Sequence, residues 1–289
     1  MSTEAPNWYV ERYKADVIYQ FQAAGHVLRG TYMPPAKIEG KTLYFPIAGK
    51  GDATEMPENI SDLKPMNAGR DKKSVTTKAY QAAEYIREID LNRMSANERA
   101  VAQKQAADAL GRRADKVVYG ALQAGTGTYG TVRGNAGGAW TLGDALQVAT
   151  DLFKKDVPED GRAYCGVPQQ AWSQMMTYEE FNNSQWVAGD LPFQKVRRAK
   201  FWAGINWFTL PEELFITTAN VTKFYAWHFN ALGAGYNGEE MATRVTWENP
   251  KTAWLHNSWM DIGATVLLPE GIVECQYLST SALTAFTAG

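Results

Sequence analysis

Residues 95–124 carry one uninterrupted helical pattern, and a helix of this length restricts the folds open to the chain more than any other feature. Ser95 and Glu98 fit a capping box, in which each side chain accepts a hydrogen bond from the other residue's backbone N–H. Gly125 is suited to end the helix. At 1.5 Å per residue, roughly 28 residues form a rod of about 40 Å, longer than a small domain is wide. Gly111, in its middle, indicates either close packing against a neighbour, which the sequence favours, or a hinge.

The predicted helix has one apolar side made mostly of alanine. That side carries Ala106, Ala107, Leu110, Ala114, Val117, Val118 and Ala121, and the other side carries Lys104, Asp108, Arg112, Asp115 and Lys116. This division is typical of an amphipathic helix with one buried face. Small side chains let the backbone of another element approach closely, so we expect the helix to pack lengthwise against a sheet.

Composition sets limits on partners and location. The chain has 289 residues, of which 45% are hydrophobic, enough for one large or two modest domains. A net charge of −2 lacks the basic excess of proteins that bind nucleic acid by neutralising phosphates. No apolar run reaches the length of a membrane span and no signal peptide is recognisable, so we expect a soluble protein with no membrane partner. Cys165 and Cys275 lie in apolar runs, which predicts buried free thiols.

The first ninety residues suggest two projecting segments. Residues 9–28 have helical spacing at Tyr13, Val17, Phe21, Ala24 and Leu28, which predicts an N-terminal arm with a helix. Residues 42–47 alternate as a strand, and the natural partner is the stretch 75–89. The 49–73 segment between them is too long for a hairpin turn and rich in charge, Gly and Pro. A protruding two-stranded arm that rests on a neighbouring copy is the economical interpretation.

The rest of the chain alternates helices and strands before a strand-rich end. Thr141 begins a helix with Leu142, Leu146, Ala149 and Leu152 on one side; a strand over 162–167 and a helix with Pro168 at its first position follow. Residues 179–200, with a basic group that includes Lys200, are interpreted as a surface loop. The strands 260–268 and 272–278 are expected to pair as a hairpin across Pro269–Gly271.

Known catalytic and binding motifs find little support. Two segments, 125–130 and 233–238, match the glycine pattern of dinucleotide sites, but neither has a strand before it and a helix after it. The three histidines are far apart and no cysteine pair has metal-ligand spacing. The sequence lacks a Gly-x-Ser-x-Gly motif between a strand and a helix, the arrangement that presents a nucleophilic serine. We therefore expect no enzyme activity, no catalytic residues, no cofactor and no metal.

Three stretches, taken in order, resemble a known family. They are residues 40–47 (GKTLYFPI), the run 85–90 (YIREID) that enters 106–110 (AADAL), and 263–273 (GATVLLPEGIV). In this order the chain resembles the major capsid proteins of tailed bacteriophages, especially short-tailed ones, which have the Hong-Kong-97-type fold. That fold is also found in encapsulin shells. The resemblance implies an α+β chain with an N-terminal arm (1–38), an extended β-hairpin loop (39–90), a peripheral domain with the spine helix (91–140), an axial domain (141–240) and C-terminal strands that return to the peripheral domain (241–289).

The same resemblance implies a function. The chain would be a structural capsid protein that assembles into pentamers and hexamers of an icosahedral shell enclosing double-stranded DNA. Its partners would be a separate scaffolding protein, a portal and a decoration protein, with assembly in the bacterial host cytoplasm and a final location in the virion. The alternatives are an encapsulin-type nanocompartment and, on the glycine patterns alone, a nucleotide-binding enzyme. Expected assembly contacts are Asp52, Glu55, Glu58, Asp62, Arg70, Lys72, Lys73, Trp186, Lys195, Arg197 and Arg198.

Overall fold

The computed structural model describes residues 25–56, 65–66, 68–87, 98–178 and 199–281, with only the backbone at residues 98 and 99. The described helices are α2 (Glu98–Ala124), α3 (Leu142–Lys154) and α4 (Gln169–Met175), with short 3-10 helices at Glu212–Leu214, Phe229–Ala231, Asn249–Lys251 and Pro269–Gly271. The strands are β1 (Lys37–Glu39), β2 (Thr42–Ala48), β3 (Arg70–Thr76), β4 (Lys78–Arg87), β5 (Val132–Arg133), β6 (Ala163–Val167), β7 (Ala199–Trp202), β8 (Ile205–Thr209), β9 (Ile216–Thr218), β10 (Val221–His228), β11 (Leu232–Tyr236), β12 (Ala242–Glu248), β13 (Ala253–Val266) and β14 (Ile272–Leu278).

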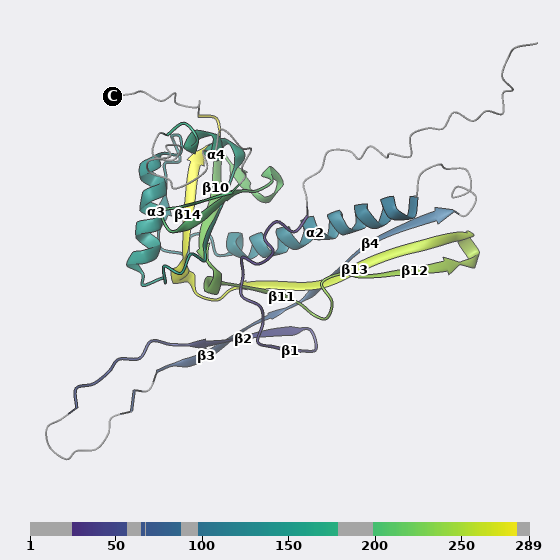
Figure 1. The fold of residues 1–289 in the computed structure, drawn as a ribbon, viewed down its shortest axis with the longest axis horizontal. Helices are drawn as coiled ribbons and strands as arrows, with labels where there is room; N and C mark the ends of the chain where they lie inside the picture. The colour runs from purple at the N-terminus through teal and green to yellow at the C-terminus, as the bar shows by residue number, and fades with distance from the viewer. Residues whose placement is uncertain (1–24, 57–64, 67, 88–97, 179–198, 282–289) are drawn as a thin grey trace, which may run out of the picture.

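These elements form an elongated molecule with three parts. Figure 1 shows a body that carries α3, α4, β10 and β14, a long limb made of α2, β4, β12 and β13, and a narrow β2–β3 hairpin that projects away from both. The described residues therefore have the α+β class expected from the sequence.

The long helix is confirmed from Glu98 to Ala124, and it lies along a sheet as expected. Its most deeply buried side chains are Ala102, Leu110, Ala114, Asp115, Val118, Tyr119 and Leu122. Asp115 was expected on the solvent side, and this is wrong: the residue is 2% exposed. The arm residues that cover it are 87 and 88 positions away in the sequence, so helical spacing alone could not reveal them.

The sheet beneath α2 is built on β13. This strand pairs antiparallel with β4 along residues 253–262, and on its other side with β12 and then β11. Its alternate residues His256, Ser258, Met260 and Ile262 are buried at 1–5% exposure. Because β-strand side chains alternate between faces, one face of the sheet is covered while the other remains partly open.

The body is a seven-stranded sheet in the order β5-β14-β10-β6-β8-β7, with β9 also paired to β10. One face packs under α3 and α4 through a cluster that includes Trp140, Leu152, Cys165, Trp207 and Cys275. The two free thiols are fully buried, as predicted. The other face carries Tyr225 and Trp227 and packs against the C-terminal half of α2.

The predicted C-terminal hairpin is wrong. β13 and β14 belong to different sheets, because both sides of β13 are already paired, whereas β14 pairs with β10 and β5. The turn Pro269–Gly271 carries the chain from one sheet to the other. The expected partner of 42–47 was also only partly right. β2 pairs with β3, including Leu43 with Val75, and β4 instead joins β13.

Four local expectations have different outcomes. Thr141 stands at the start of α3, as predicted, and it forms a full capping box with Asp144. Leu146 is 45% exposed and does not belong to the buried side of that helix. Pro168 stands at the cap position before α4, one residue earlier than expected. Of the predicted arm helix, residues 9–24 lie outside the described residues, and 25–28 form turns.

Candidate assembly surfaces

The base of the extended loop is fixed to its own subunit by a small apolar cluster. Leu43 and Phe45 of β2 are fully buried against Leu267 at the end of β13. A Cβ added at Gly233 of β11 would lie 2.8 Å from the Phe45 ring, so only glycine permits this approach. The glycine pattern at 233–238 thus serves packing within a strand, and the 125–130 pattern forms the turn after α2.

Polar contacts complete this attachment. The Lys73 ammonium donates to the carbonyl oxygens of Leu267 at 2.8 Å and Val266 at 3.2 Å, so Lys73 holds the loop base onto its own subunit. At the root of the loop, Lys50 donates to Asp156 at 2.8 Å. That hydrogen bond lowers the pKa of Asp156. Both side chains are more than 70% exposed, so the ion pair orients the loop weakly.

Beyond this base the described loop residues are exposed. Asp52 and Glu55 lie on one side of the loop and Arg70 and Lys72 on the other, all of them exposed. The Lys72 ammonium also lies 5.5 Å from the centre of the Tyr44 ring. The remaining predicted contact residues, Glu58, Asp62, Trp186, Lys195, Arg197 and Arg198, lie outside the described residues, as does Ser95 of the predicted cap. Lys200, assigned to a surface loop, is instead 8% exposed within β7.

The N-terminal arm crosses α2 at Gly111. A Cβ on Gly111 would lie 2.8 Å from the Cα of Gly25, so the glycine allows close packing, the option that the sequence favours. One turn further along the helix, the Asp115 carboxylate accepts backbone N–H groups of Val27 at 2.9 Å and Leu28 at 3.0 Å. Burial raises the pKa of Asp115, and these hydrogen bonds act against that shift. Apart from Gly111, no local pattern in the sequence indicates this contact.

A polar cluster surrounds the same crossing. His26 has a left-handed backbone (φ +63°), and its Nδ1 lies 3.0 Å from the Tyr236 hydroxyl. Its Nε2 lies 3.4 Å from the Tyr32 hydroxyl and 3.8 Å from Glu240, which also pairs with Arg29 at 2.6 Å. Burial lowers the pKa of His26, while the charges of Asp115 and Glu240 oppose that effect.

A buried carboxylate joins α2 to the body. Glu274 of β14 is 1% exposed, accepts the backbone N–H of Gly127 at 3.0 Å and pairs with Lys223 at 2.7 Å. Thr126, in the same turn, shares a hydrogen bond with the Tyr225 hydroxyl. The turn after the long helix is therefore fixed to two central strands of the body sheet. Sequence reasoning missed this joint, because a single Glu in an apolar strand has no distinctive spacing.

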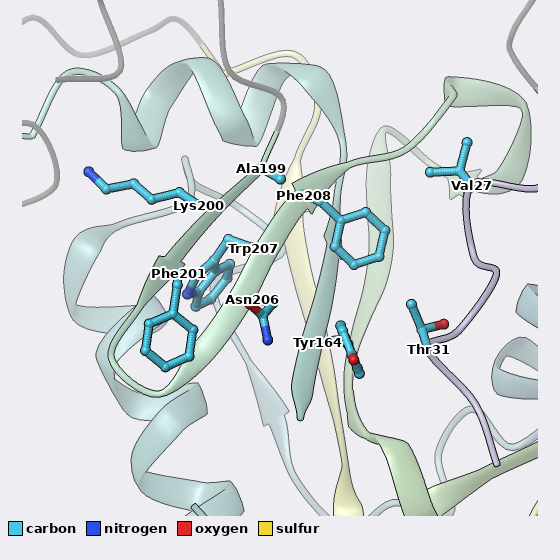
Figure 2. Close-up of a pocket in the computed structure, with 9 residues that line it drawn as sticks. All are labelled: Val27, Thr31, Tyr164, Ala199, Lys200, Phe201, Asn206, Trp207 and Phe208. Carbon is cyan, nitrogen blue, oxygen red and sulfur yellow. The ribbon is translucent and has the colours of Figure 1, made fainter. Parts of the chain in front are cut away.

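An apolar shelf lies beside the arm, on the face of the body sheet that α2 only partly covers. We use this name for Tyr164, Phe201, Asn206 and Phe208, which border a hollow of about 310 Å³ with Val27 and Thr31. Figure 2 shows Tyr164 and Phe208 between the strands and the arm, with Phe201 on the far side. Phe201 is 57% exposed and Val27 37% exposed, so the shelf is an incompletely covered part of the core.

Within the described residues, no group of three or more His, Cys, Asp or Glu side chains is placed to bind a metal ion. Among the same residues, no helix has both the length and the apolarity to cross a membrane.

Several solved phage structures have a similar fold. The chain is similar to the capsid of Ralstonia phage GP4 (TM-score 0.70, 8% identity, 97% of this chain and 98% of that chain covered) and to the capsid structure of the cyanophage P-SCSP1u (0.69, 14%, 96% and 94%). A structure of Mycobacterium phage Che8 aligns with TM-score 0.65 at 15% identity, covering 96% and 100%. The class is therefore the Hong-Kong-97-type capsid fold.

The sequence itself matches the phage capsid protein family over residues 5–279. No curated protein matches it significantly. Because the family match spans nearly the whole chain, this protein belongs to the phage capsid protein family, and it is a structural protein of the capsid.

Proposed function

We propose that this chain is the major capsid protein of a tailed phage, which assembles into pentamers and hexamers of an icosahedral shell around double-stranded DNA. The observation that carries the proposal is the β2–β3 hairpin, whose base is tightly fixed while its described tip residues are exposed and project away from the subunit (Figure 1). A projection of this kind gains little stability on its own subunit and needs a second surface.

The extended loop is proposed to lie on an adjacent copy. Identical subunits form a closed ring when each makes the same heterologous contact with the next and the rotation between neighbours adds up to a full turn. The loop carries exposed charges of both signs: Asp52 and Glu55 on one side, Arg70 and Lys72 on the other. We propose that these charges pair with a neighbouring copy and set how the two copies align. Glu58, Asp62 and the 179–200 residues Trp186, Lys195, Arg197 and Arg198 remain proposed contacts on the strength of the resemblance. Lys73 also remains a proposed contact, although in the isolated subunit its ammonium donates to the carbonyl oxygens of Val266 and Leu267.

The assignment of structural elements to two domains is also a proposal. We assign α2 with β4, β11, β12 and β13 to the peripheral domain, and α3 and α4 with the seven-stranded sheet to the axial domain. The contacts of Glu274 with Gly127 and Lys223 support a rigid connection between the peripheral and axial domains. A separate scaffolding protein, a portal, a decoration protein and assembly in the host cytoplasm are proposed from the resemblance to tailed-phage capsid proteins, and we propose no enzymatic activity.

Electron microscopy of the expressed chain, alone and with the neighbouring genes of its source, tests this function. Closed shells that contain double-stranded DNA after infection support it. Shells of the same fold that contain a protein cargo and no DNA would instead identify an encapsulin-type nanocompartment. Thermal stabilisation of the subunit by NAD or ATP would support the enzyme alternative.

A further inference from the structure

The apolar shelf is a part of the body sheet that its own described elements leave open. The opposite face of this sheet is covered by α3 and α4, and β10 and β14 are covered by α2. A sheet face in a compact domain normally packs against another layer. On β6, β8 and β7, the shelf residues Tyr164, Phe201 and Phe208 border a hollow whose other side is formed by Val27 and Thr31 of the arm.

The described part of the arm already forms the first portion of such a layer. The Trp227 indole N–H donates to the Thr31 carbonyl at 2.9 Å, which places the arm directly across the sheet. Phe208 and Tyr164 pack around the same indole, with ring centres 6.1 and 6.4 Å from it. Val27 and Thr31 then form the rim of the shelf. The arm and the shelf are therefore parts of one continuous apolar surface.

The point from which the preceding segment leaves is also fixed. Gly25 is held against Gly111, and Asp115 holds the N–H groups of Val27 and Leu28. The segment 1–24 thus ends three positions before Val27 on the shelf rim, and its sequence is rich in large apolar residues: Trp8, Tyr9, Val10, Tyr13, Val17, Ile18, Tyr19 and Phe21. A segment tethered this closely has an effective concentration of about millimolar, so docking is largely complete when its intrinsic dissociation constant is well below that concentration.

We propose that residues 1–24 dock in cis on the apolar shelf of their own subunit, with Tyr13, Val17 and Phe21 covering Tyr164, Phe201 and Phe208. This inference goes beyond the shell function, since it concerns the unassembled subunit. It also changes the role expected for the arm: its first residues complete the core of the subunit that carries them.

Thiol labelling of the monomeric subunit tests the docking. A Phe201→Cys variant places a thiol on the shelf, and Cys165 and Cys275, both fully buried, give little background. In the full chain we expect this thiol to react about tenfold more slowly than in the same variant lacking residues 1–24. Leu146→Cys, on the α3 side of the body and 45% exposed, is the control and should react equally in both chains.

A second variant covers the case in which the truncated chain does not fold. Changing Tyr13, Val17 and Phe21 to Ser in the full-length Phe201→Cys chain should raise the labelling rate as truncation does. Changing Lys14, Gln20 and Gln22 to Ser, which removes three polar residues of the same segment, should leave labelling slow.

Three outcomes would overturn the proposal. Equal labelling of Phe201→Cys with and without residues 1–24 would show that the segment does not cover the shelf. Protection that persists after truncation would assign the cover to residues 179–198. Protection that is lost on tenfold dilution, or that appears only in shells, would assign it to a second copy.

Discussion

Gly25 of the arm and Gly111 of α2 meet so closely that a Cβ built on either one would lie 2.8 Å from the Cα of the other. Helix backbone and arm backbone are thus in direct contact at the middle of the long helix. Glycine in a helix costs about 1 kcal/mol relative to alanine, and this contact leaves no room for the alanine Cβ.

Gly111→Ala should therefore destabilise the subunit, by about 1–3 kcal/mol, because the gain in helix propensity is outweighed by overpacking against the arm. Gly120→Ala is the matched control: it lies in the same helix, and its added Cβ would meet nothing within 4 Å. We expect that change to stabilise by up to about 1 kcal/mol. Urea unfolding of the two variants gives the comparison, and stabilisation by both would show that the arm does not press on α2.

Asp115→Asn should weaken the attachment of the arm. The substitution keeps the shape but replaces one of two accepting oxygens by a donor, which faces the N–H of Val27 or Leu28. Loss of one charge-assisted hydrogen bond at a 2% exposed site is expected to cost about 1.5–3 kcal/mol. Asp108→Asn on the same helix should stay within about 0.5 kcal/mol. Limited proteolysis at the arm provides a second readout, with faster cleavage expected only for the Asp115 variant.

His26 should make arm attachment sensitive to acid. Burial lowers its pKa in the folded state, so the unfolded chain binds a proton first as the pH falls below the ordinary value of about 6.5. Stability is then lost as the pH falls through that value towards the lower folded pKa. The charges that face the ring are Asp115, Glu240 and Arg29, beside the Tyr32 and Tyr236 hydroxyls.

His26→Asn removes this proton and tolerates the left-handed backbone. Between pH 7.5 and 5.5 the unfolding free energy of the natural chain should fall further than that of the variant. An identical pH dependence in both chains would exclude His26 as the cause.

Glu274→Ala should disrupt the joint between α2 and the body. It leaves the Gly127 N–H without its acceptor and Lys223 without its carboxylate. Removing one partner of a buried pair costs about 3–5 kcal/mol, and the lower end applies because Lys223 is 38% exposed. Glu213→Ala, which removes an exposed partner of Lys116, should leave the unfolding midpoint unchanged.

Local patterns predicted the long helix and the start of a helix at Thr141, because both depend on residues within a few positions. The glycine at 111 indicated close packing but not its partner, Gly25, which is distant in the sequence. Local patterns failed where the partner is distant. Asp115 has the spacing of a surface residue, and only the arm buries it. The strands β13 and β14 have the alternation of a hairpin, but β4 and β11 already occupy both sides of β13. Helical spacing predicted Leu146 on the buried side of α3, but its side chain is exposed because the sheet does not extend beneath it.

The projecting loop was predictable to a similar extent. A long charged segment between two strands indicated a projecting loop, and the structure has one. The sequence does not distinguish Lys73 from Lys72, although their side chains make different contacts in the structure. Lys73 donates to the carbonyl oxygens of Val266 and Leu267 at the end of β13 and just after it, while Lys72 lies exposed over Tyr44. That difference arises from the position of β13, which is almost two hundred residues further along the chain.

Deletion of residues 51–71 tests loop-mediated assembly most directly. The apolar base at Leu43 and Phe45 remains, so circular dichroism and thermal unfolding should show a folded, soluble subunit. Electron microscopy under conditions in which the natural chain forms closed particles should then show no shells from the deleted chain. Shells of normal size from a folded subunit without residues 51–71 would contradict the proposal that this loop joins neighbouring copies.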